Sequence, residues 1–376
     1  MKKKIAILTQ PLGLNYGGII QNYALQFTLR NLGYVPLTVN RQKNKISIWV
    51  RVKTKLYYFI KQIPDNNVSE KIIKFTAKNN NEFIRKHIAI TKPVASDTTI
   101  YKYFKKNKFD FCIVGSDQTW RPHYSPNIYN YFLDFLYGRK GASKCIAYAT
   151  SFGTDNWEFS QNATDKVKNL VKQFDAVSVR EDSGVTLCEK YLDTEAELVL
   201  DPTLLLSAQD YISHLELADN VMKKNIFTYI LDKNTEKEEF IKGCANEFGL
   251  PVISSQAEKD IYKYRKGDDK NDYLQPPIEK WLSGLKNADF VITDSFHGMV
   301  FSIIFGKPFI AIVNRERGAS RFTSLLKQLN LMDRLIYDVS KIPKDLLHTP
   351  IDYKKVDFTL NILREKSLNF LKHNLC

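Results

Sequence analysis

At 376 residues the chain is longer than one hydrophobic core usually grows, so its length predicts two domains. Apolar residues make up 44% and charged residues 26%, and no apolar run reaches the ~18 residues that cross a bilayer, which argues against a membrane-embedded protein. The net charge of +14 is concentrated at 41–108, where 17 Lys/Arg stand against 4 Asp/Glu.

The first elements in chain order predict a parallel α/β sheet. Residues 4–8 form a short apolar run, and a glycine-rich loop follows at 13–18. Residues 19–32 have the apolar spacing of a helix, and a second strand is expected at 35–39. This strand–loop–helix–strand order is typical of a doubly wound sheet.

The start of the chain and its cysteines favour a cytoplasmic location. Met1–Lys4 resembles the charged start of a signal peptide, but the apolar run behind it is too short for one, so we expect a first strand. Five scattered cysteines without a C-x-x-C pair indicate reduced thiols rather than a disulfide framework.

Four more strands of the first domain are expected, and each ends in polar or small residues. The expected strands are 111–114, 145–149, 176–179 and 198–200. In open parallel sheets the ligand site lies beyond the carboxyl ends of the strands. The sequence therefore predicts that these four turns border one crevice.

A second α/β series follows a linker that begins at Asp201-Pro202. Its expected strands are 226–231, 251–254, 290–293 and 308–313, with helices at 236–248, 278–286 and 299–305. We predict an N-terminal Rossmann-like domain at 1–205 on the acceptor side, with the basic 41–108 insertion. A C-terminal Rossmann-like donor-side domain at 206–355 and a helix at 356–376 that packs back on the first domain complete the expected organisation.

The strongest chemical motif is Thr293-Asp294-Ser295-Phe296-His297-Gly298, where a strand delivers a histidine to a helix start. Free N–H groups and the positive end of the helix dipole favour phosphate or carboxylate there, which makes Ser295 and Gly298 candidate donor contacts. An imidazole exchanges protons near neutral pH, so His297 is the candidate catalytic residue. The structural alternative is that His297 only caps the helix.

Arginines after two strands are candidate donor-binding residues. Arg315, Arg317 and Arg321 follow the strand at 308–313, and Arg180 follows the strand at 176–179. A guanidinium holds carboxylate and phosphate oxygens in a two-pronged geometry. The alternatives are a solvated loop around Glu316, and an ion pair of Arg180 with a neighbouring acid.

Gly115-Ser116-Asp117-Gln118-Thr119-Trp120 combines a tight turn, an acid and an aromatic ring. Asp117 is a candidate base or acceptor of sugar hydroxyl groups, and Trp120 could stack on a pyranose. Equally, Asp117 could cap a helix and Trp120 could anchor the core. With Ser116 and Gln118, these residues form the expected acceptor side.

The loop Gly13-Leu14-Asn15-Tyr16-Gly17-Gly18 matches neither the dinucleotide nor the Walker pattern. Its glycines still permit a close approach of backbone to ligand. The candidate acceptor contacts in this part of the chain are Asn15, Tyr16, Gly17 and Gln21.

Metal, cofactor and nucleic-acid functions have little support in the sequence. The acidic turn at Asp268, Asp269 and Asp272 has no histidine or cysteine at ligand spacing, so no metal is expected. Aromatic and basic residues alternate at 46–63, which fits either an amphipathic core helix or a peripheral contact with an anionic membrane. No recognised nucleic-acid module accompanies the charge.

Together these runs resemble the polysaccharide pyruvyl transferase family from Ile5 to about Leu331. The motifs that carry the resemblance are Asn15-Tyr16-Gly17-Gly18 with Gln21, Gly115-Ser116-Asp117-Gln118-x-Trp120, Val179-Arg180-Glu181, Asp201-Pro202-Thr203 and Asp294-Ser295-Phe296-His297-Gly298. The resemblance implies two Rossmann-like domains in a glycosyltransferase-B-like (GT-B-like) arrangement. It also implies transfer of a pyruvate ketal from phosphoenolpyruvate, a co-substrate, to a sugar of a cell-surface polysaccharide or its lipid-linked precursor.

The chain departs from some members of the family in the histidine motif. Some members carry Arg-Leu-His where this chain has Ser295-Phe296-His297, so the charge of that arginine must come from elsewhere. Two other functions stay open from the sequence. One is a nucleotide-sugar glycosyltransferase of the same architecture, and the other is a non-catalytic sugar- or membrane-binding partner in polysaccharide assembly.

Overall fold

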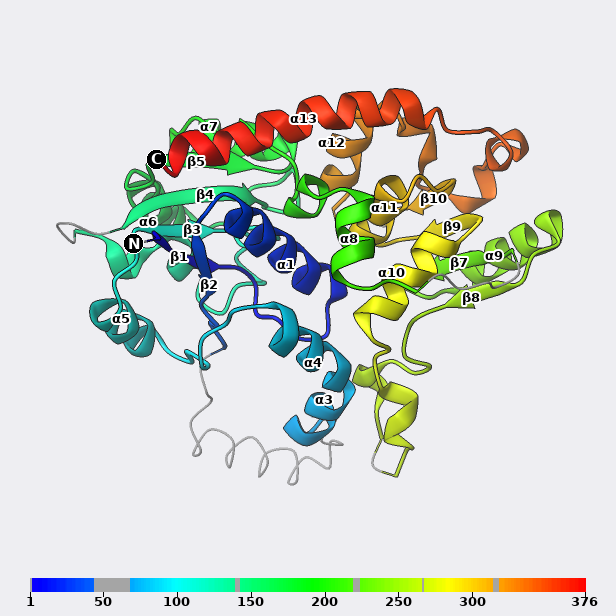
Figure 1. The fold of residues 1–376 in the computed structure, drawn as a ribbon, viewed down its shortest axis with the longest axis horizontal. Helices are drawn as coiled ribbons and strands as arrows, with labels where there is room; N and C mark the ends of the chain where they lie inside the picture. The colour runs from blue at the N-terminus through cyan, green and yellow to red at the C-terminus, as the bar shows by residue number, and fades with distance from the viewer. Residues whose placement is uncertain (1, 44–67, 139–142, 219–223, 266, 314–317) are drawn as a thin grey trace.

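The computed structural model describes residues 2–43, 68–138, 143–218, 224–265, 267–313 and 318–376, and these form two parallel β-sheets with helices packed around them (Figure 1). This confirms the α/β class and the pair of sheet domains that the sequence predicts. Among the described residues no helix is both long and apolar enough to cross a bilayer.

The first sheet has the strand order β2-β1-β3-β4-β5-β6, and all its pairs are parallel. Its strands are β1 (Lys4–Leu8), β2 (Val35–Thr38), β3 (Phe111–Val114), β4 (Lys144–Thr150), β5 (Ala176–Val179) and β6 (Glu197–Leu198). Its helices are α1 (Tyr16–Asn31), α3 (Glu70–Thr76), α4 (Lys78–His87), α5 (Asp97–Lys106), α6 (Gln161–Val171) and α7 (Asp182–Leu192). Buried apolar runs such as Phe111–Val114 suit strands covered on both faces.

The second sheet has the order β11-β10-β9-β7-β8, again with parallel pairs. Its strands are β7 (Ile226–Tyr229), β8 (Val252–Ser254), β9 (Phe290–Thr293), β10 (Phe309–Ile312) and β11 (Leu335–Ile336). The helices of this half are α8 (Ala208–His214), α9 (Thr235–Phe248), α10 (Ile278–Asn287), α11 (Phe296–Ile304) and α12 (Ser320–Gln328).

Two helices start earlier than the apolar spacing predicts, and both shifts matter for the site. The structure starts α1 at Tyr16, with Asn15 as N-cap, so Gly17 and Gly18 lie in its first turn instead of in a loop. It starts α11 at Phe296, with Ser295 as N-cap, so His297 is itself helical. Apolar periodicity cannot detect either start, because glycine and histidine carry no apolar signal.

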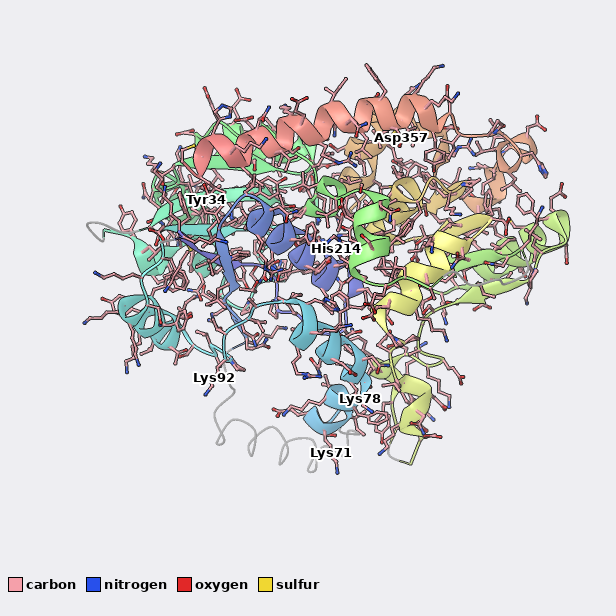
Figure 2. The ribbon with its side chains drawn as sticks, in the orientation of Figure 1. Tyr34, Lys71, Lys78, Lys92, His214 and Asp357 are labelled. Carbon is pink, nitrogen blue, oxygen red and sulfur yellow. The ribbon has the colours of Figure 1, made fainter. Side chains whose placement is uncertain are left out.

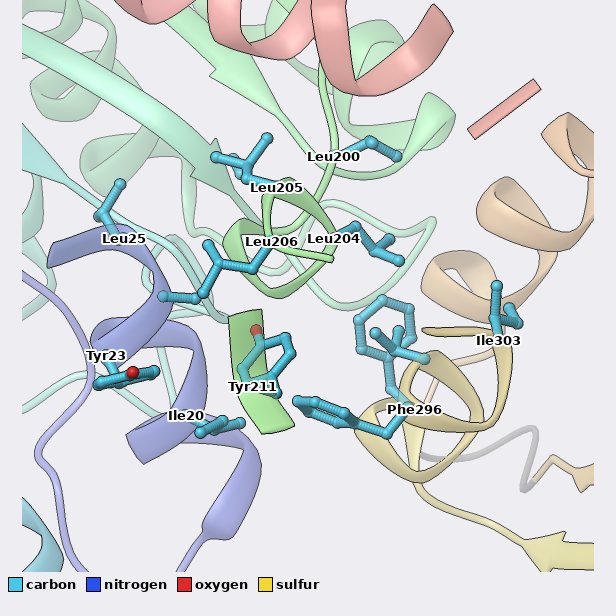
Figure 3. Close-up of a cluster of buried hydrophobic side chains, with 14 of the residues drawn as sticks. Ile20, Tyr23, Leu25, Leu200, Leu204, Leu205, Leu206, Tyr211, Phe296 and Ile303 are labelled. Atoms are coloured by element: carbon cyan, nitrogen blue, oxygen red, sulfur yellow. The ribbon is translucent and has the colours of Figure 1, made fainter. Parts of the chain in front are cut away.

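The two halves share one continuous apolar core. A cluster of buried side chains from the first sheet, α1, α8 and α11 runs from one half into the other (Figure 3). At the boundary the Tyr16 ring packs against both Tyr229 and Trp281 of the second half, and its hydroxyl donates to the Pro276 carbonyl at 2.5 Å. This packing fixes the first turn of α1 against the second domain.

The long helix α13 (Tyr353–Asn374) extends along both halves (Figure 1). At its start, the Tyr353 hydroxyl donates to the Lys307 carbonyl of the second half at 2.5 Å. Further along, Ser367 Oγ accepts from the Leu200 backbone at 2.9 Å, and Phe370 packs against Tyr148. The chain end receives a hydrogen bond from the Tyr34 hydroxyl to the Leu375 carbonyl. The helix thus ties the second domain to the first sheet.

Candidate active site

A cavity of about 190 Å³ lies between the two domains. It is lined by Asn15, Asp117, Gln118 and Tyr124 of the first half and by Leu231, Asp232, Asp294, Ser295, Phe296, His297, Gly318, Arg321 and Phe322 of the second. Pockets for drug-sized ligands usually measure roughly 300–1,000 Å³, so this one suits a smaller substrate. It lies beyond the carboxyl ends of the strands, where the sequence predicts a crevice.

Hydrogen bonds join the ends of the first-sheet strands beside this cavity. Ser116 Oγ after β3 donates to the Ala149 carbonyl of β4 at 2.9 Å and lies 3.3 Å from Asp201 Oδ2. The Thr9 hydroxyl after β1 donates to the Ser116 carbonyl at 2.9 Å. The structure therefore brings the predicted turns to one place.

His297 lies in the first turn of α11 and is 5% exposed. The Ser295 side chain accepts from the Gly298 N–H at 3.4 Å, and a Cβ at Gly298 would lie 2.3 Å from Thr293 Oγ1. The histidine ring packs on α1 of the other domain, where a Cβ at Gly17 would lie 2.0 Å from its Nδ1. Glycine at 17 therefore leaves room for the imidazole.

The other ring nitrogen of His297 faces a buried carboxylate. Nε2 lies 3.7 Å from Asp201 Oδ2 and has no hydrogen-bond partner among the described residues. That separation is longer than a hydrogen bond, so Nε2 and the carboxylate face each other without a direct bond. Burial would raise the pKa of Asp201, but the His297 imidazole, the Arg180 guanidinium and the Thr203 N–H outweigh it and hold that pKa well below its usual range.

Arg180 lies behind the cavity in a cage of carboxylates. Its Nη1 is 2.6 Å from Asp201 Oδ2, its Nη2 is 3.2 Å from Asp117 Oδ1, and its Nε is 3.9 Å from Glu181 Oε2. Burial would lower the pKa of Arg180, but the three acids raise it, so the guanidinium stays charged. These pairs favour the ion-pair alternative for Arg180, and the residue does not line the cavity.

Arg321 is the contrasting case, because it lines the cavity and its charge is unpaired. Among the described residues no hydrogen bond or ion pair reaches its guanidinium, and its buried Nε has no partner. Burial and the nearby Arg180 lower the pKa of Arg321 to about 10, which still leaves it charged at neutral pH. The Phe296 ring contacts both arginines, 5.0 Å from the Arg180 guanidinium and 5.6 Å from that of Arg321.

Asp294 lines the cavity, and its carboxylate is held by the protein. Its carboxylate accepts the Leu231 and Asp232 N–H groups at 2.6 and 3.0 Å and pairs with Lys237 Nζ at 2.7 Å. Because those bonds use both oxygens, Asp294 holds the loop after β7 against the start of α11. Across the cavity, Asp117 has a φ of +78°, an uncommon conformation for a residue with a side chain.

The predicted acceptor residues fall into two groups. Asn15 and Gln118 line the cavity, and Gly17 contacts the histidine ring. Tyr16, Gln21, Ser116 and Trp120 are instead fully buried, which corrects the prediction that they contact an acceptor. Each is held by the protein itself: Gln21 Nε2, for example, donates to the Thr9 hydroxyl and to the Gly18 carbonyl at 2.8 and 2.9 Å.

Trp120 is a core anchor. Its ring is 0% exposed and stacks on Phe132 at 4.8 Å, and its Nε1 donates to the Tyr131 carbonyl at 2.9 Å. We expect Trp120→Phe to lower the free energy of unfolding by about 1–3 kcal/mol, because that carbonyl loses its donor inside the core. Urea unfolding measures this loss. A weaker acceptor affinity at unchanged stability would contradict the assignment.

Several functional positions were not singled out from the sequence as site residues. Asp201 stands in an Asp-Pro-Thr turn after a strand, a signal that could have placed it with the other strand ends. Phe296 is part of the histidine motif without a role of its own, and Tyr124 lies between His123 and Ser125, where no spacing or charge marks it as a site residue. Arg315 and Arg317 lie outside the described residues. Within the part of the chain that the structure describes, no cluster of three metal-ligating side chains occurs.

Solved structures show the same architecture at low sequence identity. UDP-GlcNAc 2-epimerase from Neisseria meningitidis bound to UDP-GlcNAc is 10% identical, with a TM-score of 0.53 over 99% of this chain and 100% of that one. Arabidopsis thaliana UGT89C1 complexed with UDP-L-rhamnose is 9% identical, with a TM-score of 0.53 over 98% of this chain and 95% of that one. These similarities show a GT-B-like fold and nothing about the substrate.

Sequence comparison gives a short match and a long one. Non-toxic nonhemagglutinin type D from Clostridium botulinum D phage is 24% identical over 206 residues, which make up 53% of this chain and 17% of that protein. The chain therefore spans less than a fifth of that curated relative. The model of the polysaccharide pyruvyl transferase family matches residues 15–316, a range that contains Asp117, Asp201 and His297. The chain belongs to the polysaccharide pyruvyl transferase family.

Proposed function

We propose that the protein transfers a pyruvate ketal from phosphoenolpyruvate to a sugar of a cell-surface polysaccharide or of its precursor. The observation that carries the proposal is one small cavity lined by a helix-start histidine, His297, and by Arg321, whose Nε has no partner among the described residues. These are an acid–base group and an anion receptor, the two parts that this reaction needs. Membership of the family supports the reaction class.

The anionic donor binds, on this proposal, to Arg321 and to the starts of two helices. The first turn of α11 faces the cavity through Ser295 and His297, and α12 begins at Ser320 without a side-chain cap. Free N–H groups at helix starts attract carboxylate and phosphate. Arg321 would then supply the charge that other family members place two residues before the histidine, where this chain has Ser295.

The reaction proceeds in two stages that conserve atoms. His297 gives a proton to the methylene carbon of phosphoenolpyruvate, and one sugar hydroxyl bonds to C2. Phosphate then leaves with its oxygen, and a second hydroxyl of the same sugar bonds to C2 and closes the ketal. Counted over the whole reaction, one of the two hydroxyl protons ends on the new methyl group and the other leaves with phosphate. Asp117, at the cavity wall, is positioned to accept a hydrogen bond from a hydroxyl group.

Arg321→Gln tests the donor site. We expect the variant to bind phosphoenolpyruvate about 10–100-fold more weakly, because a hydrogen bond to a charged group contributes about 1.5–3 kcal/mol. Isothermal titration with phosphoenolpyruvate measures the change. The matched control is Arg85→Gln on the exposed face of α4, away from the cavity. Equal affinities in wild type and Arg321→Gln would remove Arg321 from the donor site.

The product released separates this function from its main alternative. A pyruvyl transferase releases inorganic phosphate from phosphoenolpyruvate, whereas a nucleotide-sugar glycosyltransferase releases a nucleoside diphosphate. The GT-B-like fold is common to both possibilities and does not choose between them. The size of the cavity, about 190 Å³, favours the smaller donor.

We also propose a peripheral contact with an anionic membrane at the inner face of the cell membrane. Exposed lysines of the basic 41–108 region, among them Lys71, Lys78 and Lys92, lie on the α3–α4 side of the molecule (Figure 2). The 46–63 segment lies outside the described residues. Binding to vesicles with anionic lipid that weakens as salt rises would support the contact, and equal binding to neutral vesicles would contradict it.

A further inference from the structure

Asp201 is a buried carboxylate whose two oxygens are both held by hydrogen bonds from the protein. Its Oδ1 accepts the Thr203 N–H and hydroxyl at 3.0 and 2.7 Å. Its Oδ2 accepts Arg180 Nη1 at 2.6 Å and lies 3.3 Å from Ser116 Oγ. The residue is 2% exposed, so its bonds come from the protein and hold the carboxylate in one orientation.

The same oxygen, Asp201 Oδ2, faces His297 Nε2 at 3.7 Å. An ionised carboxylate can only accept hydrogen bonds, so it favours a histidine that carries a proton on the facing nitrogen. A neutral imidazole has one N–H, and the partner of one nitrogen decides which of the two bears it. Asp201 therefore favours the proton on Nε2 and leaves Nδ1 with its lone pair.

Nδ1 is the ring nitrogen turned away from Asp201, and His297 lines the cavity. A Cβ at Gly17 would lie 2.0 Å from Nδ1, so the imidazole packs on α1 only because residue 17 has no side chain. Nε2, in contrast, is buried against Asp201. The two ring nitrogens thus have different environments, with a fixed anion at one and the cavity side of α1 at the other.

We propose that Asp201 is the positioning residue for His297, and that His297 exchanges its proton with the substrate through Nδ1. The substrate named in this inference rests on the proposed function. The assignment of the His297 tautomer does not depend on that function. In the first stage the Nδ1–H bond breaks as the methylene C–H bond forms. In the second stage Nδ1 takes the proton of a sugar hydroxyl. Asp201 stays ionised throughout and balances the charge of the imidazolium.

The first measurement is the histidine tautomer in the wild-type chain. Histidine-selective ¹⁵N labelling gives the shifts of both ring nitrogens, and the His297→Ala spectrum identifies the His297 signals among the six histidines. We expect the neutral ring to carry its proton on Nε2. A neutral ring with its proton mainly on Nδ1 would overturn the proposal, whatever the enzyme does with phosphoenolpyruvate.

The second measurement compares Asp201→Asn with a matched control. The amide has the shape of the carboxylate but turns a donor toward Nε2, so we expect a shift toward the Nδ1–H tautomer and a fall in kcat of about 10²-fold or more. Asp97→Asn is the control, because Asp97 also pairs with a buried arginine, Arg41 at 2.8 Å, on a helix away from the cavity. We expect it to keep the wild-type tautomer and kcat.

The outcomes separate this inference from the proposed function. A folded Asp201→Asn chain with wild-type tautomer and kcat would overturn the positioning role. If Asp201→Asn does not fold, the wild-type tautomer still decides. Absence of phosphoenolpyruvate turnover in the wild type would remove the proposed reaction, while an Nε2–H tautomer that is lost in Asp201→Asn would still establish the Asp201–His297 pair.

Discussion

His297→Ala is expected to lower kcat for phosphate release from phosphoenolpyruvate by about 10²–10⁴-fold, the contribution typical of a positioned acid–base group. The affinity for phosphoenolpyruvate should change little, because Arg321 and the helix starts remain. The fold should also persist, since no hydrogen bond of the imidazole with the described residues is lost. Steady-state phosphate release and isothermal titration measure the two effects separately.

The control for this variant is His373→Ala, an exposed histidine near the end of α13. It removes an imidazole without reaching the cavity, so its kcat should equal that of the wild type. A His297→Ala chain that retains full kcat would show that another group supplies the proton. A large loss of phosphoenolpyruvate affinity at unchanged kcat would make His297 a binding residue only.

Gly17→Ala is expected to lower kcat by about 10²-fold or more, because one added methyl group displaces the His297 ring, the proposed acid–base group. The new Cβ would lie 2.0 Å from His297 Nδ1 and 2.6 Å from its Cγ, closer than real contacts allow. Alanine would by itself favour the helix by about 1 kcal/mol, but overpacking a filled interface costs about 1–3 kcal/mol. The free energy of unfolding should therefore fall or stay level.

Gly243→Ala provides the matched control in α9. A Cβ at this exposed position would meet no atom within 4 Å, so the substitution isolates the helix effect. We expect the free energy of unfolding to rise by about 0.5–1 kcal/mol, with kcat unchanged. Urea unfolding and steady-state turnover of both variants test the pair. A Gly17→Ala chain with a similar gain in stability and wild-type kcat would contradict the packing of His297 on α1.

The sequence predicts this site best where a polar motif directly follows an apolar strand. His297 follows a buried strand, so its place beside a strand end can be read from neighbouring residues, while its catalytic role stays a prediction. The gathering of the strand ends is also predictable, because parallel strands end at the same edge of a sheet. The GT-B-like pairing of the two sheets follows from the family resemblance.

Contacts between residues far apart in the sequence decide the features of the site that local sequence patterns cannot predict. Trp120 and Tyr16 have ring chemistry that suits sugars, yet both rings are buried by residues distant in sequence. Arg180 reads as an anion receptor until Asp201 and Asp117, 21 and 63 positions away, neutralise it. Local spacing carries no information on such pairs, which arise only when the strand ends meet.

Ketal formation itself is tested most directly with phosphoenolpyruvate that carries ¹³C at C2. The purified chain is incubated with this donor and a panel of sugars that present neighbouring hydroxyl pairs, and the label is followed by NMR. We predict that the labelled carbon changes from an enol carbon to a ketal carbon on one sugar, with one phosphate released per ketal, and that His297→Ala abolishes the change. Label that stays in phosphoenolpyruvate while the chain releases a nucleoside diphosphate from a nucleotide sugar would contradict the account.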